Sequence, residues 1–167
     1  MRKLRIALDI DDTIGGFIDA YNRFYKTDIS KEEDSKITRQ VNKLRYNKSF
    51  WESLSKIEDI DFIPEMYCTK RVNPKDYTKN WLRENNFPVK PVYQVVYQKG
   101  NKARFIKGRC DVLIDDSVSN VLDCINAGLP ALLIDRPHNR WFGPEYRIYS
   151  LSYTEIEEAY NILTTYV

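Results

Sequence analysis

Cysteine and histidine are scarce in this sequence of 167 residues, which holds three cysteines and one histidine. The cysteines, Cys68, Cys110 and Cys124, are widely spaced and include no C-x-x-C pair. They therefore predict reduced, mostly buried thiols, with neither a disulfide framework nor a thiolate metal site. The single histidine, His138, has no partner motif around it, so a structural or solvated role is the commoner expectation.

An excess of one charge and long apolar runs are also missing. Lysine and arginine total 26 against 24 aspartates and glutamates, for a net charge of +2, so no global attraction to nucleic acid or anionic membrane is expected. The first apolar run is interrupted by Asp9 and is too short for a signal peptide or a membrane span. These absences predict a cytoplasmic protein without a membrane partner.

One basic stretch stands out against this balance. Residues 35–48 contain several basic side chains and no acidic one, namely Lys36, Arg39, Lys43, Arg45 and Lys48. A solvated helix face is the commoner reason for such a stretch. A track for a longer phosphate backbone is the alternative, so long nucleic acid stays a candidate partner that the sequence does not favour.

The fold is indicated by short apolar runs that alternate with helical stretches. With 43% hydrophobic and 13% aromatic residues, the chain can bury the core of one domain. Strands are predicted at residues 4–8, 65–68, 92–96, 111–114 and 130–134, with a short edge strand at 147–149. The sequence therefore predicts an α/β protein with a Rossmann-like parallel sheet and helices on both faces.

Helix ends support this placement. Asn73-Pro74 predicts a cap followed by proline at the first helical position, and Gly128 is expected to end the helix that begins near Ser117. The segment from Ser152 to Glu155 reads as a capping box that opens a C-terminal helix.

The interval after the first strand is longer than a crossover requires. Residues 14–64 lie between Thr13 and the second predicted strand, whereas a simple crossover needs roughly a dozen residues. The sequence predicts two or three short helices here, forming a small cap over residues 16–59. Residues 1–15 and 60–167 would then form the core.

Acidic residues follow two of the predicted strands. The first strand leads into Asp9-Ile10-Asp11-Asp12-Thr13, and the fourth leads into Asp115-Asp116. Parallel strands present their carboxyl ends at one edge of the sheet, where open α/β folds bind ligands. Converging carboxylates repel one another unless a cation joins them, and oxygen ligands without histidine or cysteine favour Mg²⁺.

These residue types also suit phosphoryl transfer. Asp9 can attack phosphorus as a covalent nucleophile while Asp11 moves the protons. Thr69 at the end of the second strand and Lys102 can donate to the phosphate oxygens. Lys70 and Arg71 are further candidates for contact with phosphate, although solvated positive side chains are at least as common.

The ordered set resembles the four signature motifs of the haloacid dehalogenase superfamily: Asp9-x-Asp11-x-Thr13, then Thr69, Lys102 and Asp115-Asp116. The resemblance implies that Asp9 is the nucleophile and Asp11 the general acid and base, with Thr69 and Lys102 holding the phosphate. It also implies a Mg²⁺ site formed by Asp9, Asp116 and the Asp11 backbone carbonyl, with Asp115 as a supporting residue. Lys99 is an alternative to Lys102, and the family commonly has glycine where Asp12 stands.

Within the superfamily, the chain looks most like the 5'(3')-deoxyribonucleotidases and their bacterial and phage relatives. The resemblance rests on the short cap, the Asp115-Asp116-Ser117 segment with Asn120, and the element Arg136-Pro137-His138-Asn139-Arg140, where the branch usually has tryptophan in place of His138. It implies a Mg²⁺-dependent hydrolase of nucleoside monophosphates.

Substrate contacts and alternatives complete the prediction. Thr13, Lys70, Arg71, Phe17 and Trp51 are the candidate substrate-binding residues, the two aromatic ones through stacking on a base, although most aromatic side chains of the cap are expected to form its own core. A polynucleotide 3'-phosphatase or a sugar-phosphate phosphatase would use the same chemistry. A module that binds Mg²⁺ or a phosphoryl group and signals without catalysis is the alternative of another class.

Overall fold

The computed structural model describes residues 2–29, 34–95 and 101–165. Their main feature is a six-stranded sheet in the order β5-β4-β1-β6-β7-β8, in which every neighbouring pair is parallel. The strands are β1 (Ile6–Leu8), β4 (Met66–Thr69), β5 (Val92–Gln94), β6 (Val112–Asp115), β7 (Ala131–Ile134) and β8 (Arg147–Ile148). The α/β prediction is confirmed, and each predicted strand overlaps an observed one, although Val96 lies outside the described residues.

The chain order places the switch point of the sheet at β1. From β1 the chain first adds β4 and β5 on one side, and then β6, β7 and β8 on the other. The strands β1 and β6, which carry the two acidic segments, are therefore neighbours, with Leu8 opposite Ile114. Ligands of open α/β sheets bind outside the carboxyl ends of the strands at such a point.

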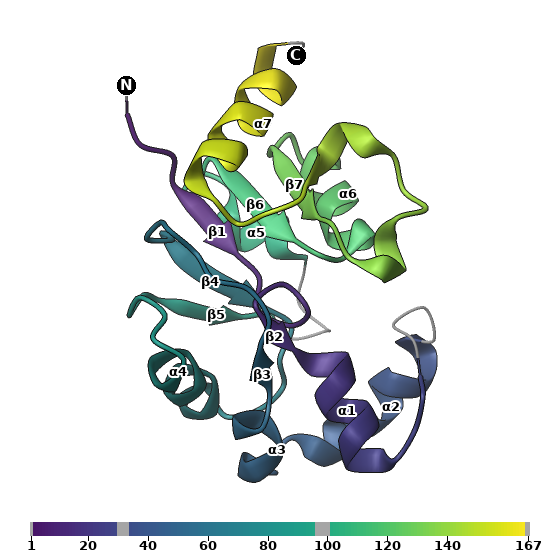
Figure 1. Cartoon of the computed structure of the whole chain (residues 1–167). Helices are drawn as coiled ribbons and strands as arrows, with labels where there is room; N and C mark the ends of the chain where they lie inside the picture. Colours follow the sequence, from purple (N-terminus) through teal and green to yellow (C-terminus); the bar gives the residue numbers. More distant parts are fainter. Residues whose placement is uncertain (1, 30–33, 96–100, 166–167) are drawn as a thin grey trace.

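Alternation along the strands divides the core into two layers. In β1, Ile6 and Leu8 pack on one face of the sheet, and Ala7 packs on the other. The first face is covered by α4 (Lys75–Glu84) and α7 (Tyr153–Thr165), and the second by α5 (Lys102–Ile106) and α6 (Val118–Asn126) (Figure 1). The prediction of helices on both faces is confirmed.

Helix α6 ends as predicted, but two predicted helix starts differ from the structure. Gly128, just after α6, has a φ of 73°, which favours glycine. The N-cap of α4 is Pro74, one position after the predicted cap Asn73. The Ser152 hydroxyl accepts from the Glu155 amide at 3.3 Å, as in a capping box. The Glu155 carboxylate instead accepts from the Tyr149 and Ser150 amides at 2.6 and 3.0 Å, so the reciprocal half of the box is absent.

Three helices lie between β1 and β4: α1 (Phe17–Tyr25), α2 (Asp34–Leu44) and α3 (Lys48–Glu52). A short antiparallel pair, β2 (Gly15–Gly16) and β3 (Ser55–Lys56), carries the chain into and out of this segment. A Cβ atom at Gly15 would lie 2.9 Å from the Trp81 ring, which explains the need for glycine here. Figure 1 shows the three helices beyond the carboxyl ends of the strands, at the opposite end from both termini.

Aromatic side chains form the interior of this helical segment, as predicted. Phe17 packs on Phe50 and Trp51, with ring centroids 5.8 and 5.9 Å apart, and all three side chains are buried. Tyr21 is also buried, whereas Phe24 is 47% exposed. The division into a core and a cap at residues 16–59 stays a prediction.

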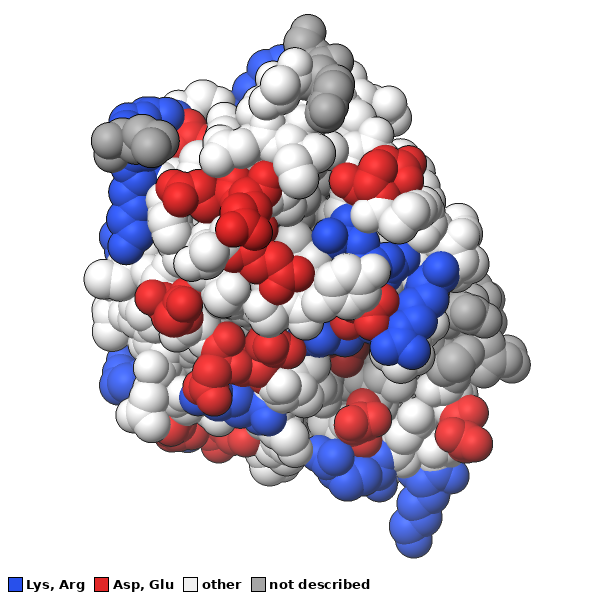
Figure 2. Space-filling view, turned by 45° about the horizontal axis from the view of Figure 1, so that its top comes forward, with Lys and Arg blue, Asp and Glu red and all other residues white. Residues whose placement is uncertain are grey.

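The surface of the described part of the chain mixes both signs of charge. On the face presented in Figure 2, acidic and basic side chains are interspersed, in keeping with the net charge of +2. Among the described residues, no helix has the length and apolar character needed to cross a membrane.

Candidate active site

The loop after β1 is a tight turn that presents several acidic side chains. The Ile10 carbonyl accepts hydrogen bonds from the amides of Thr13, Ile14 and Gly15 at 3.3, 3.0 and 2.9 Å. Arg136, from the segment after β7, donates to the carbonyls of Asp12 and Thr13 at 2.9 and 2.8 Å. The turn is therefore held both by its own backbone and by a residue distant in the sequence.

Asp12 has a structural role in this turn. Its φ of 59° lies in the left-handed region, which aspartate tolerates better than most residues. The family that the chain resembles commonly has glycine at this position. Its Oδ1 accepts from the amide of Ile18 at 3.1 Å, in the first turn of α1. The side chain thus satisfies a backbone amide of α1 that the helix leaves unpaired.

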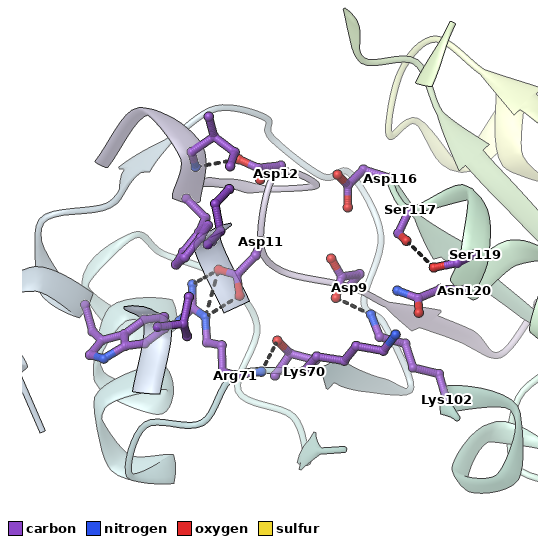
Figure 3. Close-up of a pocket in the computed structure, with 16 residues that line it drawn as sticks. Asp9, Asp11, Asp12, Lys70, Arg71, Lys102, Asp116, Ser117, Ser119 and Asn120 are labelled. Atoms are coloured by element: carbon purple, nitrogen blue, oxygen red, sulfur yellow. Dashed lines mark hydrogen bonds and ion pairs between the residues drawn. The ribbon is translucent and has the colours of Figure 1, made fainter. Parts of the chain in front are cut away.

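Lys102 joins the two acidic segments. Its ammonium group donates to Asp9, as Figure 3 shows. It also donates to Asp115 Oδ2 at 2.6 Å. The Lys102 side chain is 1% exposed, and both carboxylates are buried. Lys102 is the first residue of α5, whose N-cap Asn101 accepts from the Arg104 amide at 3.3 Å. The short helix therefore fixes where the lysine stem enters the site.

Asp115 and Asp116 follow one another but have different surroundings. Asp115 Oδ1 accepts from the Ser117 amide at 2.9 Å, and both of its oxygens accept from the Asn120 amide group at 3.1 Å. Asp115 therefore supports its neighbours and opens α6. Asp116 Oδ2 instead lies 2.8 Å from His138 Nε2.

Three carboxylates form a group that is suited to a metal ion. Asp9, Asp115 and Asp116 each offer an oxygen, and these oxygens lie within 4.8 Å of one another. Burial raises the pKa of Asp9 to about 8, although Lys102 acts in the opposite direction. Burial also disfavours the charged form of Lys102, but Asp115 and Asp9 outweigh it and raise the pKa of the lysine. The two carboxylates beside Lys102 thus favour the charged form of the lysine.

Asp11 points to a second basic residue. Its carboxylate accepts from Arg71 Nε at 2.9 and 3.1 Å and from Arg71 Nη2 at 2.7 Å, and Figure 3 shows it turned toward this guanidinium group. The Cζ atom of this guanidinium lies 5.3 Å from the centroid of the Trp51 ring and 5.4 Å from that of the Trp81 ring. Arg71 therefore contacts both the candidate acid and base and the helical segment.

A cleft of about 160 Å³ opens over these groups, between the sheet edge and the helical segment. Most of the predicted site residues line it: Asp9, Asp11, Phe17, Trp51, Thr69, Lys70, Arg71, Lys102 and Asp116. Thr13 and Asp115 are fully buried behind them, and the Thr13 hydroxyl donates to Asp9 Oδ2 at 3.2 Å. The structure thus brings the predicted residues together, while their functional roles stay predictions.

Several residues of the cleft were not predicted. Ile37 and Val41 of α2 form part of its apolar wall, and Ser117, Ser119 and Asn120 line its opposite side. The spacing of Ile37 and Val41 indicates one helix face, but not what this face contacts. The contacts of His138 and Arg136 had no sequence signal because they depend on how distant loops pack. Lys99, and the side chains of Lys36 and Arg39, lie outside the described residues.

Comparison with known proteins adds one relative. No family model matches the chain. A protein of Clostridium acetobutylicum named as a nucleotidase is 27% identical over 168 aligned residues, which cover 84% of each chain. The similarity to this protein and the buried acidic cluster are compatible with a phosphatase or a nucleotidase.

Proposed function

We propose that this protein is a Mg²⁺-dependent phosphohydrolase of the haloacid dehalogenase type that hydrolyses nucleoside monophosphates through an aspartyl-phosphate on Asp9. The observation that carries the proposal is the buried group in which Lys102 joins Asp9 to Asp115, beside Asp116, at the switch point of the sheet. The order of these residues along the chain agrees with the motif order on which the resemblance rests.

The chemistry follows from the positions of the side chains. An oxygen of Asp9 forms a bond to phosphorus while the bond from phosphorus to the ester oxygen breaks, and Asp11 gives this leaving oxygen a proton. Water then attacks phosphorus and gives a proton to Asp11, and the bond between phosphorus and Asp9 breaks. Thr69 and Lys102 line the same cleft and would donate to the phosphate oxygens during both steps.

The charges of the site fit a divalent cation. Asp9, Asp115 and Asp116 are buried together, and Lys102 is the buried cation that bonds to two of them. We propose that Asp9 and Asp116 hold Mg²⁺ with the Asp11 carbonyl, while Asp115 stays bonded to Lys102 and Asn120. When bound, the ion would neutralise negative charge on the phosphate and on Asp9.

The walls of the cleft support a nucleotide as the substrate. One side carries the acidic and basic groups, and the other is apolar, with Phe17, Ile37, Val41 and Trp51. A phosphate at the polar side would leave the base and sugar against the apolar side, where stacking contributes about 1–3 kcal/mol per base. The name of the Clostridium relative agrees with this substrate class.

The test is phosphate release from a panel of substrates, with Mg²⁺ and with a chelator. The panel contains ribo- and deoxyribonucleoside 5'- and 3'-monophosphates, 3'-phosphorylated oligonucleotides and sugar phosphates. We expect Mg²⁺-dependent release from a mononucleotide and none from the Asp9→Asn variant. Preferred release from oligonucleotide ends or sugar phosphates would change the substrate, and no release from any substrate would favour a non-catalytic binding module.

A further inference from the structure

Arg71 makes a largely buried ion pair with Asp11, the candidate general acid and base. Its side chain is 0% exposed, whereas that of Asp11 is 22% exposed. Two nitrogens on one edge of the guanidinium, Nε and Nη2, donate to the same carboxylate. Such a fork fixes the orientation of a carboxylate as well as its position.

The guanidinium also lies over two aromatic rings, with Arg71 Cζ 5.3 Å from the Trp51 centroid and 5.4 Å from the Trp81 centroid. The Trp51 ring comes from α3 and the Trp81 ring from α4. The indole nitrogen of Trp51 donates to the Leu44 carbonyl and that of Trp81 to the Leu54 carbonyl, each at 2.8 Å. Arg71 Nη1 also lies 3.5 Å from the Thr78 hydroxyl. Because both rings are anchored, the guanidinium has little freedom to turn away from Asp11.

These contacts bear on whether Arg71 holds the phosphate. Asp11 occupies the guanidinium edge that carries Nε and Nη2, and the Arg71 side chain is 0% exposed, so this edge is not open to a phosphate. Lys70 and Lys102 line the same cleft and offer positive charge there. The geometry therefore favours action of Arg71 through Asp11 over direct contact with the substrate.

We propose that Arg71 is a positioning residue, which aims the Asp11 carboxyl group at the leaving oxygen and is itself fixed by the Trp51 and Trp81 rings. This inference rests on the proposed function, because it gives Asp11 the role of proton donor. It adds a residue to the reaction and explains why the helical segment and α4 both contact the guanidinium group. Loss of the fork should impair proton donation without impairing attack by Asp9.

Leaving groups separate these two effects. The alkoxide of a nucleoside needs a proton when it leaves, whereas p-nitrophenolate leaves without one. The experiment measures the first turnover of both substrates by rapid quench, with Mg²⁺ present, for the wild type and Arg71→Lys. This variant keeps the charge and the aliphatic stem but loses the fork. We expect nucleoside release to slow by about 10- to 100-fold, and p-nitrophenolate release to change by less than about threefold.

A matched control comes from another fork in the same protein. Arg5 binds Asp111 through Nε and Nη2, at 3.3 and 2.8 Å, just before β1 and β6 and away from the cleft. Arg5→Lys makes the same chemical change there and should leave both first-turnover rates unaltered. If Arg71→Lys does not fold, as judged by circular dichroism, Thr78→Val takes its place. This variant removes the hydroxyl beside Arg71 Nη1, and it should likewise slow nucleoside release more than p-nitrophenolate release.

A double-mutant cycle gives a second measurement. If Arg71 acts only through Asp11, adding Arg71→Lys to the Asp11→Asn variant should have little further effect. Nucleoside release by the double variant should be slower than that by Asp11→Asn alone by less than about twofold. Equal slowing of both leaving groups, no slowing of either, or full additivity with Asp11→Asn would overturn the positioning role. The wild type distinguishes this failure from that of the proposed function. A wild type inactive on every substrate would overturn both, whereas any of these three results with an active wild type would overturn the positioning role alone.

Discussion

His138 Nε2 lies 2.8 Å from Asp116 Oδ2 and 3.2 Å from the carbonyl oxygen of the same residue. Asn139 Nδ2 also donates to this carbonyl, at 2.9 Å. The segment after β7 thus holds both the backbone and the carboxylate of a proposed metal ligand. Groups that orient metal ligands in this way commonly contribute 10- to 100-fold to metal affinity, as an order of magnitude.

The contact of His138 predicts a change in Mg²⁺ affinity. His138→Ala removes the side chain that orients Asp116, so the Kd for Mg²⁺ should rise by about tenfold, whereas His138→Gln keeps a donor and should change it less. Isothermal titration calorimetry of Mg²⁺ into each protein measures this effect. Equal affinity in His138→Ala and the wild type would show that the contact does not support the metal site.

Substitution of each of the two loop aspartates should affect the reaction differently. Asp9→Asn should lower kcat by at least about a thousandfold, because it removes the nucleophile. Asp11→Asn should leave a phosphorylated protein that hydrolyses slowly, by about 10²- to 10⁴-fold, because it removes the proton carrier. Acid quench with radiolabelled substrate detects this species. The exposed Asp19→Asn is the control, and unaltered kinetics in either variant would remove that residue from its role.

Loss of Lys102 should destabilise the fold as well as stop activity. Lys102→Met conserves most of the volume but leaves Asp9 and Asp115 without their shared cation. Removal of one partner from a buried ion pair costs about 3–5 kcal/mol of unfolding free energy. Urea denaturation in the presence of a chelator measures this loss, with the exposed Lys75→Met as the control. A variant as stable as the wild type would contradict the buried pairing.

The turn at Asp12 predicts an ordered series of stabilities. Asp12→Asn keeps both the acceptor and the tolerance for positive φ, so its effect should be small. Asp12→Gly loses the bond to the Ile18 amide, and Asp12→Ala also places an alanine at φ 59°. Asp12→Ala should therefore be less stable than Asp12→Gly by about 1–2 kcal/mol. Thermal and urea unfolding give the order, and an alanine variant equal to the glycine variant would refute the backbone argument.

The pair of Arg5 and Asp111 predicts a dependence of stability on pH. Burial acts to raise the pKa of Asp111, but hydrogen bonds from the Arg5 guanidinium and amide outweigh it and lower the pKa below 3.8. A lowered folded-state pKa contributes stability above the unfolded-state pKa, and this contribution is lost as the pH falls through the folded-state value.

The Asp111→Asn variant tests this relation. Its urea midpoint should lie below that of the wild type at pH 7, and the gap should close as the pH falls below about 4. Asp28→Asn, at an exposed position, should show no such pattern. A gap of the same size at pH 3 and pH 7 would mean that the charge of Asp111 does not contribute.

Much of the fold follows from local sequence patterns. The apolar runs 4–8, 111–114 and 130–134 predicted β1, β6 and β7, because a short apolar run is a property of neighbouring residues and is typical of a strand buried on both faces. Local patterns were less informative at helix starts. The Glu155 carboxylate binds amides before the helix instead of the Ser152 amide, since the path of the preceding chain decides which amides it can reach.

The candidate site also has features that follow from the local sequence and others that depend on tertiary packing. The sequence by itself determined that Asp9 and Asp115 stand at the carboxyl ends of parallel strands, because both follow apolar runs and such ends lie at one edge of the sheet. The structure showed that these two strands are neighbours. Only the tertiary structure decided which nitrogen-bearing side chain each carboxylate meets. Asp11 meets Arg71, which lies near two indole rings, and Asp116 meets His138, through packing of segments 60 and 22 positions apart. Such contacts depend on the packing of whole elements, and no local periodicity encodes them.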